Sequence, residues 1–387
     1  MRSSSKNKPI TVLHVFGGLD IGGSETLIMN LMREIPHGMF RFMFVKHVSS
    51  WGAYEEEIKN LGCDISVAPK FNGLNYFEYR NWWKRYFDHH KEIDIVHAHM
   101  RSTASIYLRQ AKRNGLITIA HSHNSSDENG FRAFIKSIMY RGINDASDAR
   151  LACSVDAGRW LFGDTFLAKE NDAVFPNAIN TQLFKFDKSK RQFIRKALQI
   201  SPDAFVLGNV GRFVQQKNHQ FLLEVFSKFL RLDPSAILVM VGDGPLMPET
   251  KFFAKRLGIE SSVRFVGNRL NVSDYYSSFD YFVFPSIFEG LGNVLIESQT
   301  AGLHCLASMG VPTDANILGA VSYLPLECGS QSWANYIYEQ QRSRGDCLQR
   351  ESAALEVQGS AFDVQIAASK LCNIYIDLLP YKSSYIK

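Results

Sequence analysis

Residues 10–35, ITVLHVFGGLDIGGSETLIMNLMREI, contain a strand pattern, a glycine-rich turn and a helix pattern in that order. Ile10–Phe16 is a short apolar run, and Ser24–Ile35 repeats apolar side chains at the i, i+3, i+4 spacing of an amphipathic helix. The glycines between them can adopt positive φ and let a ligand approach the backbone closely. Ser24 is expected to cap the helix. This stretch predicts the first strand and helix of an α/β fold.

Short strand patterns alternate with helix patterns along the rest of the chain, which indicates parallel sheets because parallel strands need crossover connections. The alternation is interrupted at 174–190, where Phe175-Pro176-Asn177 ends a short strand and KFDKSKR is polar. The expected strands are Ile10–Phe16, Phe40–Val48, Ile65–Val67, Ile93–His97, Ile117–His121 and Leu151–Cys153, followed by Phe205–Val210, Ile237–Val241, Val263–Val266, Tyr281–Phe284 and His304–Ala307. Helices of the second series are expected at 218–232, 248–257 and 293–301.

Two doubly wound, Rossmann-like α/β domains that face each other across a cleft account for this order of elements. We place the first domain at 1–185, a linker near 180–190 and the second domain at 190–360. The last segment, 361–387, contains a helix pattern with an apolar face that must be buried. Its expected apolar positions are Ile366, Ala367, Leu371, Ile374, Tyr375 and Leu378.

The composition is that of an ordinary globular protein, with 45% hydrophobic and 21% charged residues in 387. No run approaches the about 20 apolar residues that a membrane span needs, and the N-terminal apolar stretch is too short for a secretory signal. The six cysteines are isolated, which is typical of a reducing compartment, so we expect a cytoplasmic protein. The net charge of +5 is spread over both halves, so nucleic acid is not an expected partner.

The first candidate site is the loop that contains Gly17, Gly18, Gly22 and Gly23, directly before the first helix. A helix N-terminus offers free N–H groups to an anion, although a plain tight turn would have the same glycines. The loop lacks the G-x-G-x-x-G spacing of dinucleotide-binding folds. Gly242-Asp243-Gly244 lacks it too, because Met247 stands where the third glycine belongs. No Gly-Lys pair exists, so there is no P-loop.

The second candidate site is Gly211–Asn218, GRFVQQKN, directly after an expected strand. Arg212 and Lys217 flank a loop at the carboxyl edge of a parallel sheet. Arginine can grip two phosphate oxygens and lysine acts as a point charge, so this loop suits a diphosphate. The alternative is a pair of solvated surface cations.

The third candidate site is 285–297, PSIFEGLGNVLIE. Glu289 falls in the loop at the sheet edge, and Glu297 falls about one turn into the next helix. The amides of Leu291, Gly292 and Asn293 lie at the start of that helix, where N–H groups lack helical partners. The two carboxylates could serve acid–base chemistry or simply lie on the surface.

Two histidine pairs, His97 and His99 in IVHAHM and His121 and His123 in IAHSHN, have a spacing that could be taken for zinc ligands. We do not expect a metal here, on the reasoning that the members of each pair alternate across a strand end and point opposite ways. No cluster of acidic or cysteine ligands accompanies them.

Two segments combine aromatic and basic side chains without a matching number of acids. Residues 76–91, YFEYRNWWKRYFDHHK, contain Trp82 and Trp83 beside Lys84 and Arg85, and 131–141 reads FRAFIKSIMYR. Helices of this kind suit an anionic membrane surface. The alternative is that their apolar faces pack on the sheet and their cations are solvated.

At this point the chain resembles a known family. PSIFEGLGNVLIESQTAG resembles the E-x(7)-E motif of the retaining family-four glycosyltransferases, which have the GT-B fold. GRFVQQKNH resembles their G-R-x-x-x-x-K segment, and VGDGPL, HVFGGLDIGGSETLIMNL and IAHSHN match in the family's order. The likeness is greatest to exopolysaccharide and capsule enzymes. Two departures are Gly292, where the family often has Pro, and Ala178, where it often has Gly.

The resemblance implies a role for each matching residue. Arg212 and Lys217 would hold the donor diphosphate, Glu297 the ribose hydroxyls and Glu289 the donor sugar. The amides of 291–293 would lie near the sugar and phosphate, the Gly17–Gly18 loop would close over the phosphates from the other domain, and His121 would lie by the reacting centre. The last helix, about Phe362 to Leu379, would cross back onto the first domain.

The resemblance also implies a nucleotide-sugar donor, expected to be UDP-linked, and a lipid-linked or glycan acceptor at the cytoplasmic face of a membrane. No two Asp residues form the D-x-D motif of metal-dependent transferases, so Arg212, Lys217 and helix amides would replace a metal and no cofactor is expected. Two alternatives stay open: a catalytically inactive sugar-nucleotide-binding partner subunit, and a nucleotide-sugar 2-epimerase of the same fold.

Overall fold

A computed structural model describes residues 8–36, 38–123, 142–343 and 350–380. The chain divides into two units, of which the first comprises Met1–Ala178 with Val364–Lys387 and the second Ile179–Asp363. Where we predicted a linker, the structure has two short helices, α8 (Thr181–Phe184) and the start of α9 (Lys188–Ala197). The polar residues in this segment cap these helices and lie on their exposed faces. The Asp187 side chain, for example, accepts hydrogen bonds from the first amides of α9.

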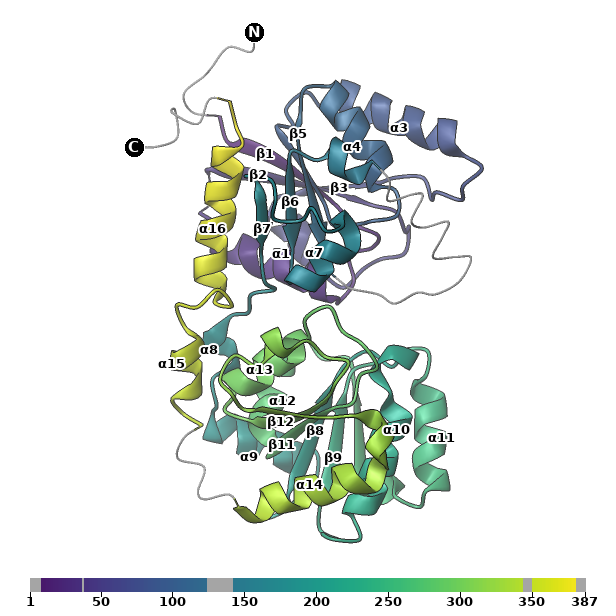
Figure 1. Ribbon diagram of the computed structural model, residues 1–387, viewed down its shortest axis with the longest axis vertical. Helices are drawn as coiled ribbons and strands as arrows, with labels where there is room; N and C mark the ends of the chain where they lie inside the picture. The colour runs from purple at the N-terminus through teal and green to yellow at the C-terminus, as the bar shows by residue number, and fades with distance from the viewer. Residues whose placement is uncertain (1–7, 37, 124–141, 344–349, 381–387) are drawn as a thin grey trace. The chain divides into compact units, whose positions relative to one another are not determined.

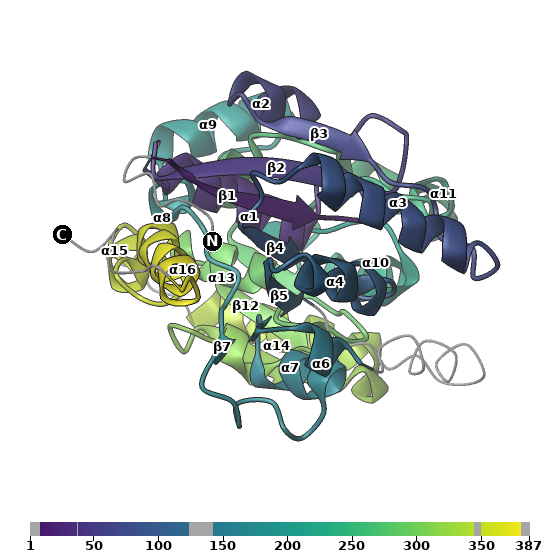
Figure 2. The same cartoon turned by 90° about the horizontal axis from the view of Figure 1, so that it is seen from above.

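The first unit is built on a sheet of seven parallel strands in the order β3-β2-β1-β4-β5-β6-β7 (Figure 2). The chain moves outward from β1 in one direction and then returns to continue in the other, which makes the sheet doubly wound. The strands are β1 Ile10–Val15, β2 Phe40–Lys46, β3 Asp64–Val67, β4 Ile95–Ala98, β5 Ile117–Ser122, β6 Ala149–Ala152 and β7 Asp172–Val174.

Helices cover both faces of this sheet (Figure 1). They are α1 Gly23–Glu34, α2 Glu55–Asn60, α3 Tyr76–His89, α4 Ala104–Arg113, α6 Ile143–Ala146, α7 Val155–Phe162 and α16 Val364–Asp377. The last of these, α16, packs against α1 and joins the core of the first unit through Leu371 and Tyr375. Ile366 was wrongly assigned to its buried face and is 45% exposed, because Val364, Ala367 and Ala368 fill that position instead.

The second unit repeats the plan with six parallel strands in the order β10-β9-β8-β11-β12-β13. The strands are β8 Val206–Val210, β9 Ile237–Val241, β10 Val263–Gly267, β11 Tyr281–Phe284, β12 His304–Ser308 and β13 Val321–Leu324. We did not predict β13, which follows β12 through the short turn η3 (Thr313–Ala315) and not through a helix, so the alternation of strand and helix patterns does not mark it. The short turn η1 (Gln215–Lys217) follows β8.

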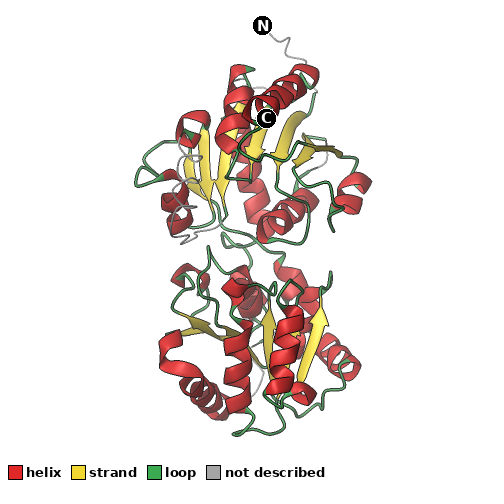
Figure 3. Cartoon of the chain, turned by 90° about the vertical axis from the view of Figure 1, so that its right-hand side faces the viewer, coloured by secondary structure: helices red, strands yellow, loops and turns green. Residues whose placement is uncertain are grey.

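The helices of the second unit also lie on both faces of its sheet (Figure 3). Besides α8 and α9 they are α10 His219–Phe229, α11 Met247–Arg256, α12 Val272–Ser278, α13 Asn293–Thr300, α14 Gly329–Ser343 and α15 Ala353–Val357. The core between sheet and helices includes Phe226 and Phe229 from α10 and Trp333 from α14, all fully buried.

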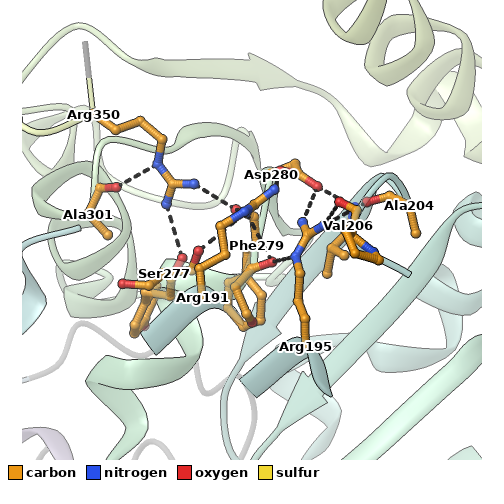
Figure 4. Close-up of polar contacts among 12 residues, drawn as sticks. Arg191, Arg195, Ala204, Val206, Ser277, Phe279, Asp280, Ala301 and Arg350 are labelled. Atoms are coloured by element: carbon orange, nitrogen blue, oxygen red, sulfur yellow. Dashed lines mark hydrogen bonds and ion pairs between the residues drawn. The ribbon is translucent and has the colours of Figure 1, made fainter. Parts of the chain in front are cut away.

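Three arginines fix the turn between α12 and β11 (Figure 4). Arg191 and Arg195 donate to the two carboxylate oxygens of Asp280, each at 2.6 Å. Arg350 donates to the carbonyls of Tyr276, Phe279 and Ala301. Arg191 also donates to the carbonyls of Ser277, Ser278 and Phe279, so the arginines hold the end of α12 in place beside the sheet.

No helix in the described part of the chain combines the length and the hydropathy of a membrane span.

Candidate functional site

Both sheets have the same strand order, so both have a point where the direction of winding reverses. In the first unit it lies between β1 and β4, and in the second between β8 and β11. Ligands of open α/β sheets bind at the carboxyl ends of the strands at such a point. The glycine loop follows β1, whereas Gly211–Asn218 and 285–292 follow β8 and β11. All three candidate loops therefore lie at these two edges.

In the second unit, Lys217 and Glu289 form an ion pair, with Nζ 2.6 Å from Oε1. Their side chains are 18% and 8% exposed, and the ammonium also lies 4.8 Å from the centre of the Phe284 ring. The two residues come from different loops, 72 positions apart in sequence. The pair holds the Lys217 ammonium in place at the sheet edge.

Close backbone contacts hold these loops together. A Cβ on Gly242, whose φ is +136°, would lie 2.1 Å from the carbonyl oxygen of Gly211, and one on Gly310 would lie 2.0 Å from that of Ile287. Only glycine can stand at either position. Gln216 accepts from the Ile287 amide and donates through Nε2 to the Phe288 carbonyl. The loop that contains Glu289 is thus fastened to the turn that contains Lys217.

Glu297 lies on α13 beside this pair, and Tyr276 Oη donates a hydrogen bond of 2.6 Å to its Oε2. Burial raises the pKa of the Glu297 carboxyl from 4.5 to about 7, against the opposing effects of the Tyr276 hydrogen bond and the Lys217 charge. Glu297 is therefore close to half ionised at neutral pH. Sequence reasoning missed Tyr276, since nothing in VSDYYSS distinguishes it from its neighbour.

The helix α13 begins at Asn293, and Gly292 precedes it with φ +87°. Proline has φ near −65°, so it could not adopt this conformation. Gly292 therefore has a backbone conformation that a proline at this position could not adopt. Arg212 is exposed and makes no ion pair with any described residue, which is the state of a cation open to a ligand.

The glycine loop of the first unit differs from our expectation in two respects. None of Gly17, Gly18, Gly22 or Gly23 has positive φ, and α1 begins at Gly23 with Gly22 as its N-cap. Ser24 is already inside the helix and donates to Glu25 Oε2, so it does not cap. Gly18 and Gly22 allow close contacts instead: a Cβ on Gly18 would lie 3.0 Å from Val48, and one on Gly22 would lie 2.5 Å from Glu25 Oε2.

The prediction that the paired histidines point opposite ways was wrong. Side chains two residues apart on a strand share a face, and alternation applies only to adjacent residues. The ring centres of His97 and His99 are 4.2 Å apart, and those of His121 and His123 are 4.0 Å apart. With His14 of β1 they form a histidine cluster at the edge of β1, β4 and β5: His14, His97, His99, His121 and His123.

Hydrogen bonds link the rings of the histidine cluster. His14 Nδ1 lies 2.9 Å from His99 Nε2, and His99 Nδ1 lies 2.9 Å from His123 Nε2. His97 Nε2 lies 3.2 Å from His121 Nδ1. Burial lowers the pKa of His14 and of His123 to about 3, and it lowers the pKa of the other three well below its usual value. All five rings are therefore neutral, and His121 is buried.

The aromatic helix α3 uses most of its aromatic face for packing. Trp83, Tyr86 and Phe87 are buried, as an amphipathic helix on a sheet requires. Phe77 is 72% exposed and Leu74, just before the helix, is 95% exposed. Lys84 and Arg85 are exposed as well. The second predicted membrane segment, 131–141, lies outside the described residues.

Comparisons with known proteins agree with this architecture. The family model described as glycosyltransferase family 4 matches residues 21–183, and that described as glycosyl transferases group 1 matches 190–320. The glycosyltransferase EpsF of Bacillus subtilis is 31% identical over 97% of each chain. The capsular polysaccharide biosynthesis glycosyltransferase CapH of Staphylococcus aureus is 24% identical over 95% of this chain and 99% of its own.

Two further matches bear on ligands. An Escherichia coli enzyme, the UDP-Gal:alpha-D-GlcNAc-diphosphoundecaprenol alpha-1,3-galactosyltransferase, is 26% identical over 56% of this chain and 58% of its own. The crystal structure of Anabaena HepE in complex with UDP and glucose superposes with a TM-score of 0.75 at 17% identity, covering 94% of this chain and 98% of that one. At that identity the second likeness concerns the fold alone.

The chain belongs to the family-four, group 1 glycosyltransferases, in the branch that builds exopolysaccharides and capsules. Its two Rossmann-like units confirm the fold class that the sequence predicted. It is a glycosyltransferase of polysaccharide biosynthesis.

Proposed function

We propose that the protein is a retaining, metal-independent hexosyltransferase that moves a sugar from UDP to a lipid-linked saccharide. The observation that carries the proposal is the Lys217–Glu289 pair with Glu297 beside it at the β8/β11 edge. A UDP-linked donor and a lipid-diphosphate acceptor are both named for the Escherichia coli relative. Retention rests on the resemblance of PSIFEGLGNVLIESQTAG to the family motif.

In the proposed reaction the bond between the sugar C1 and the β-phosphate oxygen breaks, and a bond from C1 to an acceptor hydroxyl oxygen forms. The proton of that hydroxyl passes to the departing diphosphate. Negative charge develops on the departing diphosphate. Lys217 and Arg212 neutralise it, and the amides of Leu291, Gly292 and Asn293 at the start of α13 add partial positive charge. Glu297 accepts hydrogen bonds from the ribose, and Glu289 holds the sugar once the diphosphate shares Lys217.

In the first unit we assign donor binding to the glycine loop of Gly17, Gly18, Gly22 and Gly23, and a place by the reacting carbon to His121. Because His121 is neutral, it can donate a hydrogen bond to a sugar hydroxyl without adding charge. Because cationic side chains serve the diphosphate, we propose that catalysis needs neither a metal nor a cofactor.

To test the proposed transfer reaction, the purified chain is incubated with a panel of UDP-sugars and an undecaprenyl-diphosphate monosaccharide, with and without EDTA. We expect UDP release that depends on the acceptor, an α-linked product from an α-linked donor, and unchanged turnover in EDTA. Turnover that is abolished by chelation and restored by Mg²⁺ or Mn²⁺ would contradict the metal-free mechanism. UDP binding without turnover on any acceptor would favour the inactive partner subunit, and isomerisation of the sugar nucleotide would favour the 2-epimerase.

We further propose that the protein works at the cytoplasmic face of the membrane and reaches its acceptor by binding an anionic lipid surface. Leu74 and Phe77 expose apolar groups at the N-terminal end of α3, and Lys84 and Arg85 are exposed about two turns further along the helix. Cations near such a surface contribute about 1 kcal/mol each.

A flotation assay with phosphatidylglycerol vesicles tests this surface. We expect salt-sensitive binding that is lost when Lys84 and Arg85 become Glu. In the control variant, Lys251 and Lys255 become Glu; both are exposed lysines on α11 of the other unit. Equal binding by the two double variants would refute the assignment.

A further inference from the structure

His14, His97 and His99 have no part in the transfer reaction proposed above, and their geometry in the first unit fits a different ligand. His14 and His97 are paired in the register of β1 and β4, and His99 lies two residues further along on the same face as His97. One ring nitrogen from each of these three residues lies within 4.8 Å of the other two. Zinc bound by imidazole has Zn–N distances of about 2.0–2.1 Å, which places nitrogens of a tetrahedral site about 3.4 Å apart. Small ring rotations therefore suffice to bring the three nitrogens onto one ion.

The outer nitrogens of two of these rings are already held. His97 Nδ1 lies 2.8 Å from Tyr375 Oη on α16, and His99 Nδ1 lies 2.9 Å from His123 Nε2. In metal sites, a ligating histidine almost always bonds through its second nitrogen to an outer partner, which fixes the ring and its tautomer. The bonds at Nδ1 of both rings leave Nε2 of each as the ligand atom, and His99 Nε2 lies 2.9 Å from His14 Nδ1.

The surroundings select the kind of ligand. His14, His97 and His99 are 1%, 0% and 8% exposed, and Phe16 stacks on His99 with ring centres 4.3 Å apart. The groups of potential ligands that the described residues bring together here contain imidazoles alone. Imidazole suits zinc, nickel and copper, whereas magnesium, calcium and manganese prefer oxygen ligands. A diphosphate-bound magnesium ion would find no carboxylate in this group.

We propose that His14, His97 and His99 form a binding site for a transition-metal cation of the zinc class, separate from the charged edge of the second unit. Three imidazoles and a water molecule satisfy the four coordination of zinc. The ion would join β1 to β4 and, through Tyr375, to α16. Its role is structural, so it is compatible with transfer that needs no metal at the diphosphate. Because the ligands are buried, the ion enters as the chain folds.

The test loads the full chain with metal during folding. The protein is refolded with ZnSO₄ or, separately, with CoCl₂, and is dialysed against metal-free buffer before its metal content is measured by mass spectrometry. We expect about one zinc per chain in the wild type and in His47→Gln, a buried histidine of the same unit outside the histidine cluster. We expect a loss of at least about tenfold in bound zinc for His14→Gln and His97→Gln. The cobalt form should absorb visible light with the intensity of a tetrahedral site.

Two outcomes would overturn the site. The first is a zinc content of the folded wild type that is no higher than the zinc content of His14→Gln. The other, which does not depend on any variant folding, is a folded wild-type chain without cobalt absorption, which would show that the rings form only a hydrogen-bonded network. Neither outcome bears on UDP release, so failure of this site is distinguishable from failure of the proposed transfer activity.

Discussion

The two sheet edges of this protein share a topology and differ in chemistry. At the β1/β4 edge five neutral imidazoles gather with a glycine loop, and at the β8/β11 edge a lysine and two carboxylates meet beside the start of a helix. The same strand order thus gives each unit an edge at which we propose a ligand site, and the side chains decide what can bind there. An anionic diphosphate gains from the cation and amides of the second edge, whereas a transition metal gains from the nitrogens of the first.

The largest expected effect comes from removing the cation of the charged edge. Lys217→Ala should lower kcat by about 10²–10³-fold, because one preorganised donor to developing charge contributes about 2.7–4 kcal/mol. Arg212→Ala should lower kcat in the same direction. Turnover with saturating UDP-sugar measures both effects.

The matched control for this prediction is Lys251→Ala. Lys251 also places its ammonium over a phenylalanine ring, at 5.7 Å from Phe265, but lies outside the charged edge. Lys217→Ala leaves the buried Glu289 without its ion pair, which can destabilise the variant. The thermal midpoint of Lys217→Ala should therefore be compared with that of the double variant Lys217→Ala/Glu289→Gln. If Lys217→Ala is folded and as active as Lys251→Ala, the assignment of the charged edge is wrong.

The sequence predicted the charged edge better than the neutral one for a physical reason. Lys217, Glu289 and Glu297 each follow a strand or open a helix, so local pattern alone placed them at one end of one sheet. The histidine cluster depends on register between β1, β4 and β5, which no local pattern shows, and we also assigned the wrong side-chain alternation to its pairs. Tyr276 and the Arg350 contacts were missed for the same reason, since they join segments distant in sequence.

A second prediction compares the glycines of the two edges. Gly292 has φ +87° and a Cβ there would lie 3.1 Å from Val311, whereas Gly17 has ordinary φ and its nearest atom is 3.8 Å away. Gly292→Ala should therefore lower the free energy of unfolding by about 1–3 kcal/mol, and Gly17→Ala should change it by less than about 0.5 kcal/mol. Chemical denaturation with urea measures both. If both substitutions lower the free energy of unfolding by the same amount, the two loops tolerate an added side chain equally well.

A third prediction concerns pH. The folded pKa of Glu297 is raised to about 7, so its contribution to stability is fully present below about 4.5 and is lost as pH rises through 7. Ribose hydroxyls donate to the ionised form, so UDP affinity should rise with pH between 6 and 8, by up to about tenfold per pH unit. Calorimetric titrations of UDP at several pH values measure this dependence.

Two variants sharpen the pH prediction. Tyr276→Phe removes a hydrogen bond that lowers the pKa of Glu297, so the pH dependence should move to higher pH. Glu297→Gln should abolish the dependence. A pH profile of UDP affinity that is the same in Glu297→Gln as in the wild type would exclude Glu297 as its source.

The most direct test of the account measures which edge holds the nucleotide diphosphate. UDP is titrated calorimetrically at pH 8 into the wild type, Lys217→Ala and the Lys251→Ala control, each shown to be folded. We predict that Kd rises at least about tenfold in Lys217→Ala, which corresponds to about 1.4 kcal/mol, and is unchanged in the control. A Kd in Lys217→Ala equal to that of the wild type would show that the diphosphate does not bind at the β8/β11 edge and would contradict the central claim.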